Sequence, residues 1–429
     1  MRALTTAAAF LCSAVVAASP LSAQERWIES WGTPLPVLFA PSTPFERDRD
    51  GEATAERPAP GPPFIAYPAS FADQTVRMVV RSTAGGPRFR LEFANAHDAE
   101  AITFGSVHAA LAMPAGATVP GSDRVVTFGG RERLTLYPGA RAVSDPVDLD
   151  LAPLIEVAVS IYLPDYTPAT TVDPLGLMPA YIAPGNRVAD EALGDSIVTG
   201  SYFWLRGLSV PAAGPTVGTV VALGDSITEG YATTAGMHRS WPSLLAERLQ
   251  REPDLTGWGV VNAGISGNRV LRPGAGDALL ARFTDDVLGR PGVRWLIVLA
   301  SINDINMSII PGIPDGQAAT ADEIIAGLDQ LVARAHLHGI KIAGGTVMAT
   351  KGLPFYSATG EAMRRAVNEW IRSSGRFDAV IDFEAATRDP NDPLRLRSEI
   401  DPGDQVHPND AGNALMAEAI DLDIFRAGE

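Results

Sequence analysis

Ser226 is the first residue whose type and position could do chemistry. It lies in VVALGDSITEG (residues 220–230), between an apolar run that predicts a buried strand and a predicted helix. A helix start leaves backbone N–H groups free to face an anion, so a serine at this place is a candidate nucleophile. The triplet Gly224-Asp225-Ser226 is also compatible with an ordinary strand-to-helix turn. A serine nucleophile needs a base in reach, a group that orients the base, and donors for an oxyanion.

Six histidines could supply the base: His97, His108, His238, His336, His338 and His407. Of these, His238 lies in a loop soon after Ser226 and stays a possible base. His407 is the other candidate, because Asp404 precedes it by three residues and a carboxylate at that spacing can hold the ring in a loop or helical turn. The rival carboxylates are Asp382 and Asp401.

Glycine and polar residues follow several apolar runs of the second half of the chain. They form the segments NAGISGNRV (residues 262–270), SINDINM (301–307) and DPGDQVHPND (401–410). In a parallel sheet the carboxyl ends of the strands lie at one edge, where such proteins bind ligands. We therefore expect these segments to gather near Ser226.

The pattern of apolar residues divides the chain into two domains. Residues 24–210 contain short alternating runs such as TVRMVVRST and EVAVSIYLP between glycine and proline turns, which predicts a β-sandwich or jelly-roll-like domain. Residues 211–218, PAAGPTVG, are a predicted linker. In residues 219–429 compact apolar runs alternate with helical patterns, which predicts a parallel sheet covered by helices on both faces.

The first 23 residues differ from the rest of the chain. Arg2 precedes an apolar run and small residues that end at Ala23, a pattern typical of a secretory signal peptide. A membrane anchor is the alternative, but the run is short and is broken by Ser19 and Pro20. The only cysteine, Cys12, lies in this segment, so the mature chain would have no disulfide or thiol chemistry. We expect a secreted or periplasmic protein.

The four polar segments match a known family. Gly224-Asp225-Ser226, Gly267, Asn303 and Asp404-x-x-His407 follow the order of the four blocks of the SGNH (GDSL-type) hydrolases, and residues 219–429 resemble that family. The resemblance implies a three-layer α/β/α, flavodoxin-like fold. It also implies that Ser226 is the nucleophile, His407 the base and Asp404 its orienting carboxylate.

The same resemblance implies an oxyanion hole. Its donors would be the backbone N–H groups of Ser226 and Gly267 and the side-chain amide of Asn303. From WIESWGT (residues 27–33) onward, the first domain looks like the β-rich N-terminal domain that some secreted bacterial members carry.

The third block departs from the family pattern, because Ser301 stands where a glycine is usual. A Cβ at this position should alter the pocket or the backbone path that aims Asn303. We further expect Asp225 to support its turn and Asp304 to cap a helix. The residues expected near the substrate are Asn268, Arg269, Ser301 and Met307.

The resemblance implies a serine hydrolase that cleaves carboxylic esters, with short acyl or aryl groups, through an acyl-enzyme and without a metal or cofactor. The expected partner is a small-molecule ester or an acylated carbohydrate. A formal net charge of −16 argues against nucleic acid, and no stable membrane insertion is expected after signal cleavage. The alternatives are a carbohydrate O-acetyl esterase and, among non-enzymes, a glycan-binding protein with an inactive hydrolase scaffold.

Overall fold

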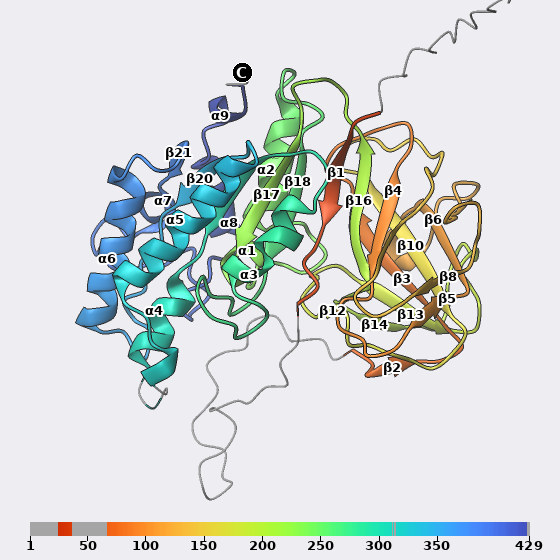
Figure 1. Cartoon of the computed structure of the whole chain (residues 1–429), viewed down its shortest axis with the longest axis horizontal. Helices are drawn as coiled ribbons and strands as arrows, with labels where there is room; N and C mark the ends of the chain where they lie inside the picture. Colours follow the sequence, from red (N-terminus) through yellow and green to blue (C-terminus); the bar gives the residue numbers. More distant parts are fainter. Residues whose placement is uncertain (1–24, 37–66, 311, 313–314, 427–429) are drawn as a thin grey trace, which may run out of the picture.

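The computed structural model describes residues 25–36, 67–310, 312 and 315–426. The predicted signal peptide, residues 1–23, therefore lies outside the described residues. In Figure 1 the strand-rich part, coloured red to yellow, stands beside a part in which strands and helices alternate, coloured green to blue. The strand β17 (Thr219–Gly224) is the first strand of this second part.

The second part is built on a sheet of five parallel strands in the order β18-β17-β19-β20-β21. Counted from β17, the order is 2-1-3-4-5, which is the flavodoxin-like order. All six residues of β17 are buried, as expected for a strand covered on both faces. The predicted α/β fold with a parallel sheet is confirmed. The other strands are β18 (Gly259–Gly264), β19 (Val293–Leu299), β20 (Lys341–Gly345) and β21 (Ala379–Ile381).

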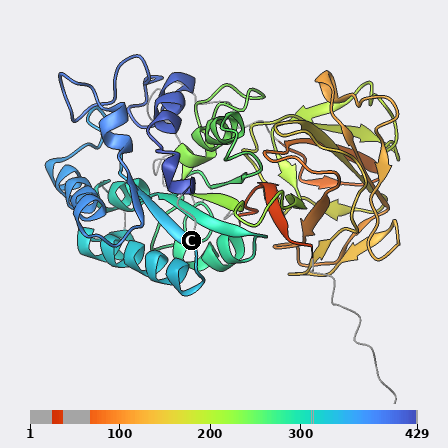
Figure 2. The same cartoon turned by 90° about the horizontal axis from the view of Figure 1, so that it is seen from above.

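Two groups of helices cover this sheet (Figure 2). In one group α2 contacts α8, and α7 also contacts α8; in the other group α5 contacts α3 and α6. The helices are α1 (Ser226–Glu229), α2 (Trp241–Arg251), α3 (Leu279–Phe283), α4 (Ile302–Ile309), α5 (Ala321–Leu337), α6 (Ala358–Ser373), α7 (Phe383–Thr387), α8 (Asp410–Glu418) and α9 (Asp423–Arg426). The short turns are η1 (Pro114–Gly116), η2 (Thr284–Leu288) and η3 (Asp315–Gln317).

The first part is rich in strands, as predicted. Its two main sheets are antiparallel, with the orders β1-β16-β4-β9 and β14-β13-β3-β10-β6-β7. Side chains from both sheets join one apolar core, in which Phe93 and Leu208 come from the first sheet and Met78 and Val159 from the second. The two sheets therefore pack face to face around that core.

The strands of the two sheets are β1 (Trp27–Gly32), β3 (Gln74–Arg81), β4 (Arg90–Ala94), β6 (Ser106–Leu111), β7 (Arg124–Val125), β9 (Arg141–Val143), β10 (Glu156–Leu163), β13 (Ala180–Pro184), β14 (Ile197–Thr199) and β16 (Leu205–Pro211). The smaller ribbons use β2 (Ser70–Phe71), β5 (Ile102–Phe104), β8 (Leu134–Leu136), β11 (Thr167–Pro168), β12 (Val172–Asp173) and β15 (Tyr202–Phe203).

The β-rich part packs against β18, the edge strand of the parallel sheet. The backbone N–H of Glu29 in β1 donates to Thr219 Oγ1 at 2.9 Å, and the N–H of Val260 donates to Thr83 Oγ1 at 2.9 Å. A Cβ added at Gly259 would lie 2.0 Å from the carbonyl oxygen of Glu29, so the two backbones touch at this point. An exposed edge strand can pair with other chains, and this contact covers it.

Candidate active site

Ser226 is placed by a tight turn at the end of β17. A Cβ on Gly224 would lie 2.2 Å from Thr228 Oγ1 and 2.5 Å from the carbonyl oxygen of Leu299, so the turn needs glycine. Asp225 accepts a hydrogen bond from the N–H of Ile227 at 3.1 Å and thereby caps α1, which confirms its predicted support of the turn. Burial raises the pKa of Asp225 to about 7. Ser226 is the first residue of α1.

Ser226, His407 and Asp404 are hydrogen-bonded in series. Ser226 Oγ lies 2.8 Å from His407 Nε2, and His407 Nδ1 lies 2.6 Å from Asp404 Oδ2. The other oxygen of Asp404 accepts the backbone N–H groups of Val406 and His407, each at 2.9 Å. Burial would raise the pKa of Asp404, but the hydrogen bonds from His407 outweigh it and hold this pKa below its usual range. An ionised Asp404 only accepts, which leaves Nε2 free to accept from Ser226.

The rival acids and bases lie elsewhere. His238 Nε2 is 2.8 Å from Glu156 of the β-rich part. Asp401 accepts the N–H groups of Gly403 and Gln405 in the loop before His407. Asp382 forms an ion pair with Arg372. The ring of Tyr231 lies beside that of His407, with 4.4 Å between their centroids.

Gly267 occupies a tight turn after β18. The N–H of Asn268 donates to the carbonyl of Ile265 at 3.0 Å and closes the turn, in which Gly267 has a φ of 75°. The third position of such a turn favours glycine because a Cβ would clash there. Asn303, in the first turn of α4, donates from Nδ2 to the carbonyl of Asn268 at 3.0 Å. The amide of Asn303 is therefore held on the Gly267 turn, while the role of both residues as oxyanion donors stays a prediction.

Asp304 does not cap its own helix, so that prediction is wrong. Ser301 is the residue at the cap position of α4. The carboxylate of Asp304 instead accepts the N–H groups of Val270 at 2.8 Å and Leu271 at 3.2 Å. Asp304 thus ties α4 to the chain after the Gly267 turn, a contact that needs the folded arrangement of two distant segments.

Two of the predicted substrate contacts need correction. The side chain of Asn268 is fully buried and donates to the carbonyls of Ala275 at 3.0 Å and Asp277 at 2.7 Å. Arg269 is also buried and donates to Gln317 Oε1 at 2.9 Å. Their polar atoms hold the loop together in this structure and do not line a substrate rim. Met307 is half-buried on α4, and its contact with substrate stays a prediction.

Ser301 has a backbone conformation that L-residues rarely adopt. Its φ is 101° and its ψ is −22°. The side chain is fully buried, and its hydroxyl has no hydrogen-bond partner among the described residues. The residue predicted to modify the pocket thus lies inside the protein. An effect of its Cβ on the backbone that leads into Asn303 stays a prediction.

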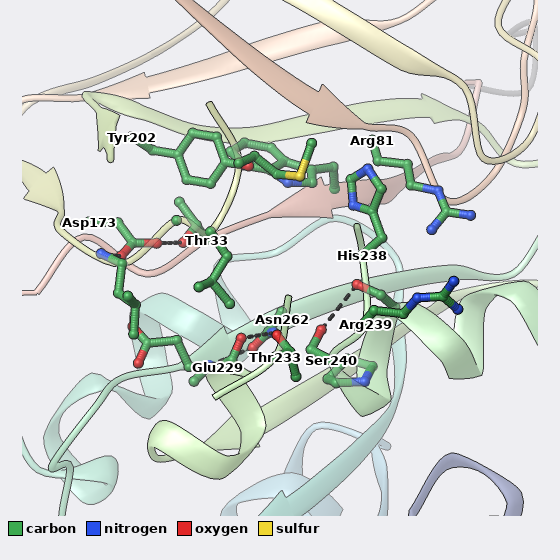
Figure 3. A pocket seen from close by; sticks show the side chains of 18 of the residues that line it. Thr33, Arg81, Asp173, Tyr202, Glu229, Thr233, His238, Arg239, Ser240 and Asn262 are labelled. Atoms are coloured by element: carbon green, nitrogen blue, oxygen red, sulfur yellow. Dashed lines mark hydrogen bonds between the residues drawn. The ribbon is translucent and has the colours of Figure 1, made fainter. Parts of the chain in front are cut away.

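A cavity of about 90 Å³ lies between the two parts of the molecule, and Ser226, His407 and Asp404 are not among its lining residues. Figure 3 shows side chains that line this cavity. Its wall includes Asp173 from the β-rich part and Glu229 from α1. Both side chains are buried. Asp173 accepts from Thr33, and Glu229 accepts from Ser266, the neighbour of Gly267.

The described residues contain no group of three or more His, Cys, Asp or Glu placed to hold a metal ion. Within the same ranges, every helix is too short or too polar to cross a lipid bilayer.

Comparison with known proteins identifies the α/β part. Residues 222–415 match the family described as GDSL-like Lipase/Acylhydrolase. No curated protein sequence is significantly similar to this chain. The α/β domain is therefore a hydrolase domain of the SGNH type, and over residues 222–415 it matches the GDSL-like lipase/acylhydrolase family.

Solved structures are similar over about half of the chain. An acetylxylan esterase from Geobacillus stearothermophilus, Axe2, is 24% identical, with a TM-score of 0.38, over 49% of this chain and 94% of its own. LAE5, an alpha/beta hydrolase enzyme from the metagenome of Lake Arreo in Spain, is 23% identical, with a TM-score of 0.39, over 48% of this chain and 94% of its own.

Ser301→Gly should make the protein more stable. Glycine adopts the observed φ freely, and the change also removes a buried hydroxyl without a partner, so we expect a gain of about 1 kcal/mol in the free energy of unfolding. Urea unfolding measures it. Ser301→Ala is the control, since it removes the hydroxyl and keeps the strain. Equal stability of the two variants would show that the backbone at this residue is not strained.

Asp173→Asn should gain stability relative to wild type as the pH rises. Burial raises the pKa of Asp173 to about 6, and burial together with Asp173 raises the pKa of Glu229 well above its usual range. The folded state thus holds the Asp173 proton more tightly than the unfolded state. The stability that this contributes is complete below about pH 4 and is lost as the pH passes about 6.

Asp173→Asn lacks this pH-dependent loss of stability. Its free energy of unfolding should therefore rise by roughly 1–2 kcal/mol relative to wild type between pH 5 and pH 8. Urea unfolding across this range measures the difference. Asp145→Asn is the control. Hydrogen bonds from Thr127 and from the backbone of Gly130 and Gly129 lower the pKa of Asp145, so its effect should be constant over the same range. A constant difference for Asp173→Asn would contradict the prediction.

Proposed function

We propose that this protein is a serine esterase that hydrolyses carboxylic esters with short acyl or aryl groups. The observation that carries the proposal is the chain of hydrogen bonds from Ser226 Oγ to His407 Nε2 at 2.8 Å and from His407 Nδ1 to Asp404 at 2.6 Å. A hydroxyl, an imidazole and a carboxylate in this order form an activated nucleophile.

In the proposed reaction His407 removes the proton of Ser226 as the hydroxyl attacks the ester carbonyl. The tetrahedral oxyanion accepts hydrogen bonds from the backbone N–H groups of Ser226 and Gly267 and from the amide of Asn303. His407 then donates its proton to the departing alcohol and leaves an acyl-enzyme. A water molecule, deprotonated by His407, releases the acid and restores Ser226. Asp404 orients the ring and stabilises its charged form throughout.

The surroundings of Ser226 support this division of roles. Asp225 is the nearest carboxyl in sequence, but it is fully buried and bound to the start of α1, so it holds the turn. Ser226 and Gly267 follow the ends of the neighbouring strands β17 and β18, which supports the proposal that their backbone N–H groups serve one oxyanion. Catalytic donors of this kind need no reorganisation during the reaction.

A carbohydrate O-acetyl ester is the second candidate substrate. It is favoured by the β-rich domain, which packs along β18 and so lies beside the sheet that carries the proposed site. We also propose that the protein acts in the periplasm or outside the cell, because residues 1–23 have the pattern of a signal peptide.

Ser226→Ala and His407→Ala should each lower kcat on an activated ester at least 1000-fold, roughly as for other serine hydrolases. Asn303→Ala should lower kcat by about 100-fold, because one oxyanion donor is lost. Hydrolysis of p-nitrophenyl acetate measures all three. The matched controls are Ser373→Ala on α6 and His238→Ala, which should keep wild-type turnover. Wild-type turnover in Ser226→Ala would refute the proposed function.

A substrate panel separates the two candidate substrates. It should compare p-nitrophenyl esters of increasing acyl length with acetylated xylan and other acetylated polysaccharides. A kcat/KM that is highest for short free esters supports the general esterase, whereas acetate release that is fastest from polysaccharide supports the deacetylase. No turnover of any ester, together with no labelling of Ser226 by a fluorophosphonate, would favour an inactive scaffold.

A further inference from the structure

Arg282 of α3 is a buried cation that joins the ends of two strands to the Gly267 turn. Its guanidinium donates to the carbonyl of Gly224 at 2.8 Å and to the carbonyl of Ala263 at 2.9 Å. Its Nε donates to the side-chain oxygen of Asn268 at 3.0 Å. One rigid group therefore contacts the last residue of β17, the strand β18 and the turn that follows it.

Asn268 connects this cation to the proposed oxyanion donors. Its side chain is fully used, because it accepts from Arg282 and donates to two backbone carbonyls of its own loop. Its backbone carbonyl accepts the amide of Asn303 at 3.0 Å, and its N–H closes the turn that contains Gly267. A shift of Asn268 would therefore move both of these donors.

The charge of Arg282 is balanced by Asp286, and a buried chain of side-chain contacts continues from Asp286 to Glu29 of the β-rich domain, whose pKa burial raises to about 7. Arg282 pairs with Asp286 at 2.9 Å, Asp286 lies 3.6 Å from Arg290, and Arg290 pairs with Glu29 of β1 at 3.1 Å. Burial would raise the pKa of Asp286, but Arg282 and Arg290 outweigh it and keep this pKa below its usual range. We call these four residues, Glu29, Arg290, Asp286 and Arg282, the Arg282 network.

Two glycines at the domain interface provide the space that the side chains of this network occupy. A Cβ on Gly32 would lie 2.2 Å from Arg290 Nη1, and a Cβ on Gly207 would lie 1.8 Å from Glu29 Oε1. The side chains of Glu29 and Arg290 are completely buried. Breaking a buried ion pair on one side leaves a charge without a partner, so each member depends on the others.

We propose that the Arg282 network positions the oxyanion donors, with Arg282 acting through Asn268 and Asn303. Glu29 makes the β-rich domain part of the same network, so that this domain helps to position the oxyanion donors. The inference rests on the proposed function of the Ser226 site. The four members are positioning residues, because their polar groups contact the protein and not the reacting atoms.

The test is a double-mutant cycle in kcat. Arg282→Lys cannot reproduce the forked contacts, and we expect it to lower kcat about tenfold with little change in KM, since small displacements of catalytic groups have effects of this order or larger. Glu29→Gln keeps the size and one acceptor oxygen and should lower kcat about threefold. Each variant is measured alone and combined with Asn303→Ala, on p-nitrophenyl acetate.

If the network acts through Asn303, Arg282→Lys and Glu29→Gln should lower kcat by a smaller factor in the Asn303→Ala background than in the wild-type background. Arg77→Lys is the control, because Arg77 is an equally buried arginine that bonds only within the β-rich domain. It should lower the melting temperature and leave kcat unchanged.

The inference would be overturned if Arg282→Lys and Glu29→Gln lowered kcat by the same factor with and without Asn303→Ala. It would also be overturned if they lowered kcat no more than Arg77→Lys does. Glu29→Gln decides the matter by itself if Arg282→Lys does not fold, which circular dichroism shows. Failure of the proposed function looks different, because wild-type turnover would then survive Ser226→Ala.

Discussion

The buried guanidinium of Arg282 is the contact on which the candidate site depends. A charged group in the interior is costly unless every donor finds an acceptor and a counter-charge lies close by. Arg282 finds acceptors for each of its three nitrogens, and a counter-charge, where the carbonyls of Gly224 and Ala263, the side chain of Asn268 and the carboxylate of Asp286 converge. The strand ends that carry Ser226 and Gly267 are thereby held in one arrangement.

The β-rich domain contributes contacts to this arrangement. Its first strand, β1, contacts β18 at Gly259, and Glu29 of the same strand pairs with Arg290 at 3.1 Å. The edge of the parallel sheet is covered at the same time, which removes a site for unwanted strand pairing. A catalytic domain with an unprotected edge and an unpaired buried arginine would be less stable by itself.

Several residues near the nucleophile occupy states that are unfavourable in isolation. Ser301 has a φ of 101°, Asp225 is buried with a pKa of about 7, and Glu229 faces Asp173 across the cavity between the domains. Such features persist only where the surrounding structure holds them, and they cluster at functional sites. Here they lie around Ser226 and the segment before Asn303.

The sequence by itself determined the parallel α/β sheet, the strand-rich first domain, and the residues Ser226, Asp404 and His407 that the structure joins by hydrogen bonds. The sheet and the strand-rich domain follow from apolar periodicity, whereas the choice of the three residues came from the resemblance of their motifs to a known family. Only the tertiary structure decided the rest. Asn268, an expected substrate contact, is instead buried and hydrogen-bonded to Arg282. Arg282 was not recognised from the sequence, because its partners lie on other elements. Contacts between distant segments depend on how strands and domains pack, and periodicity does not encode that packing.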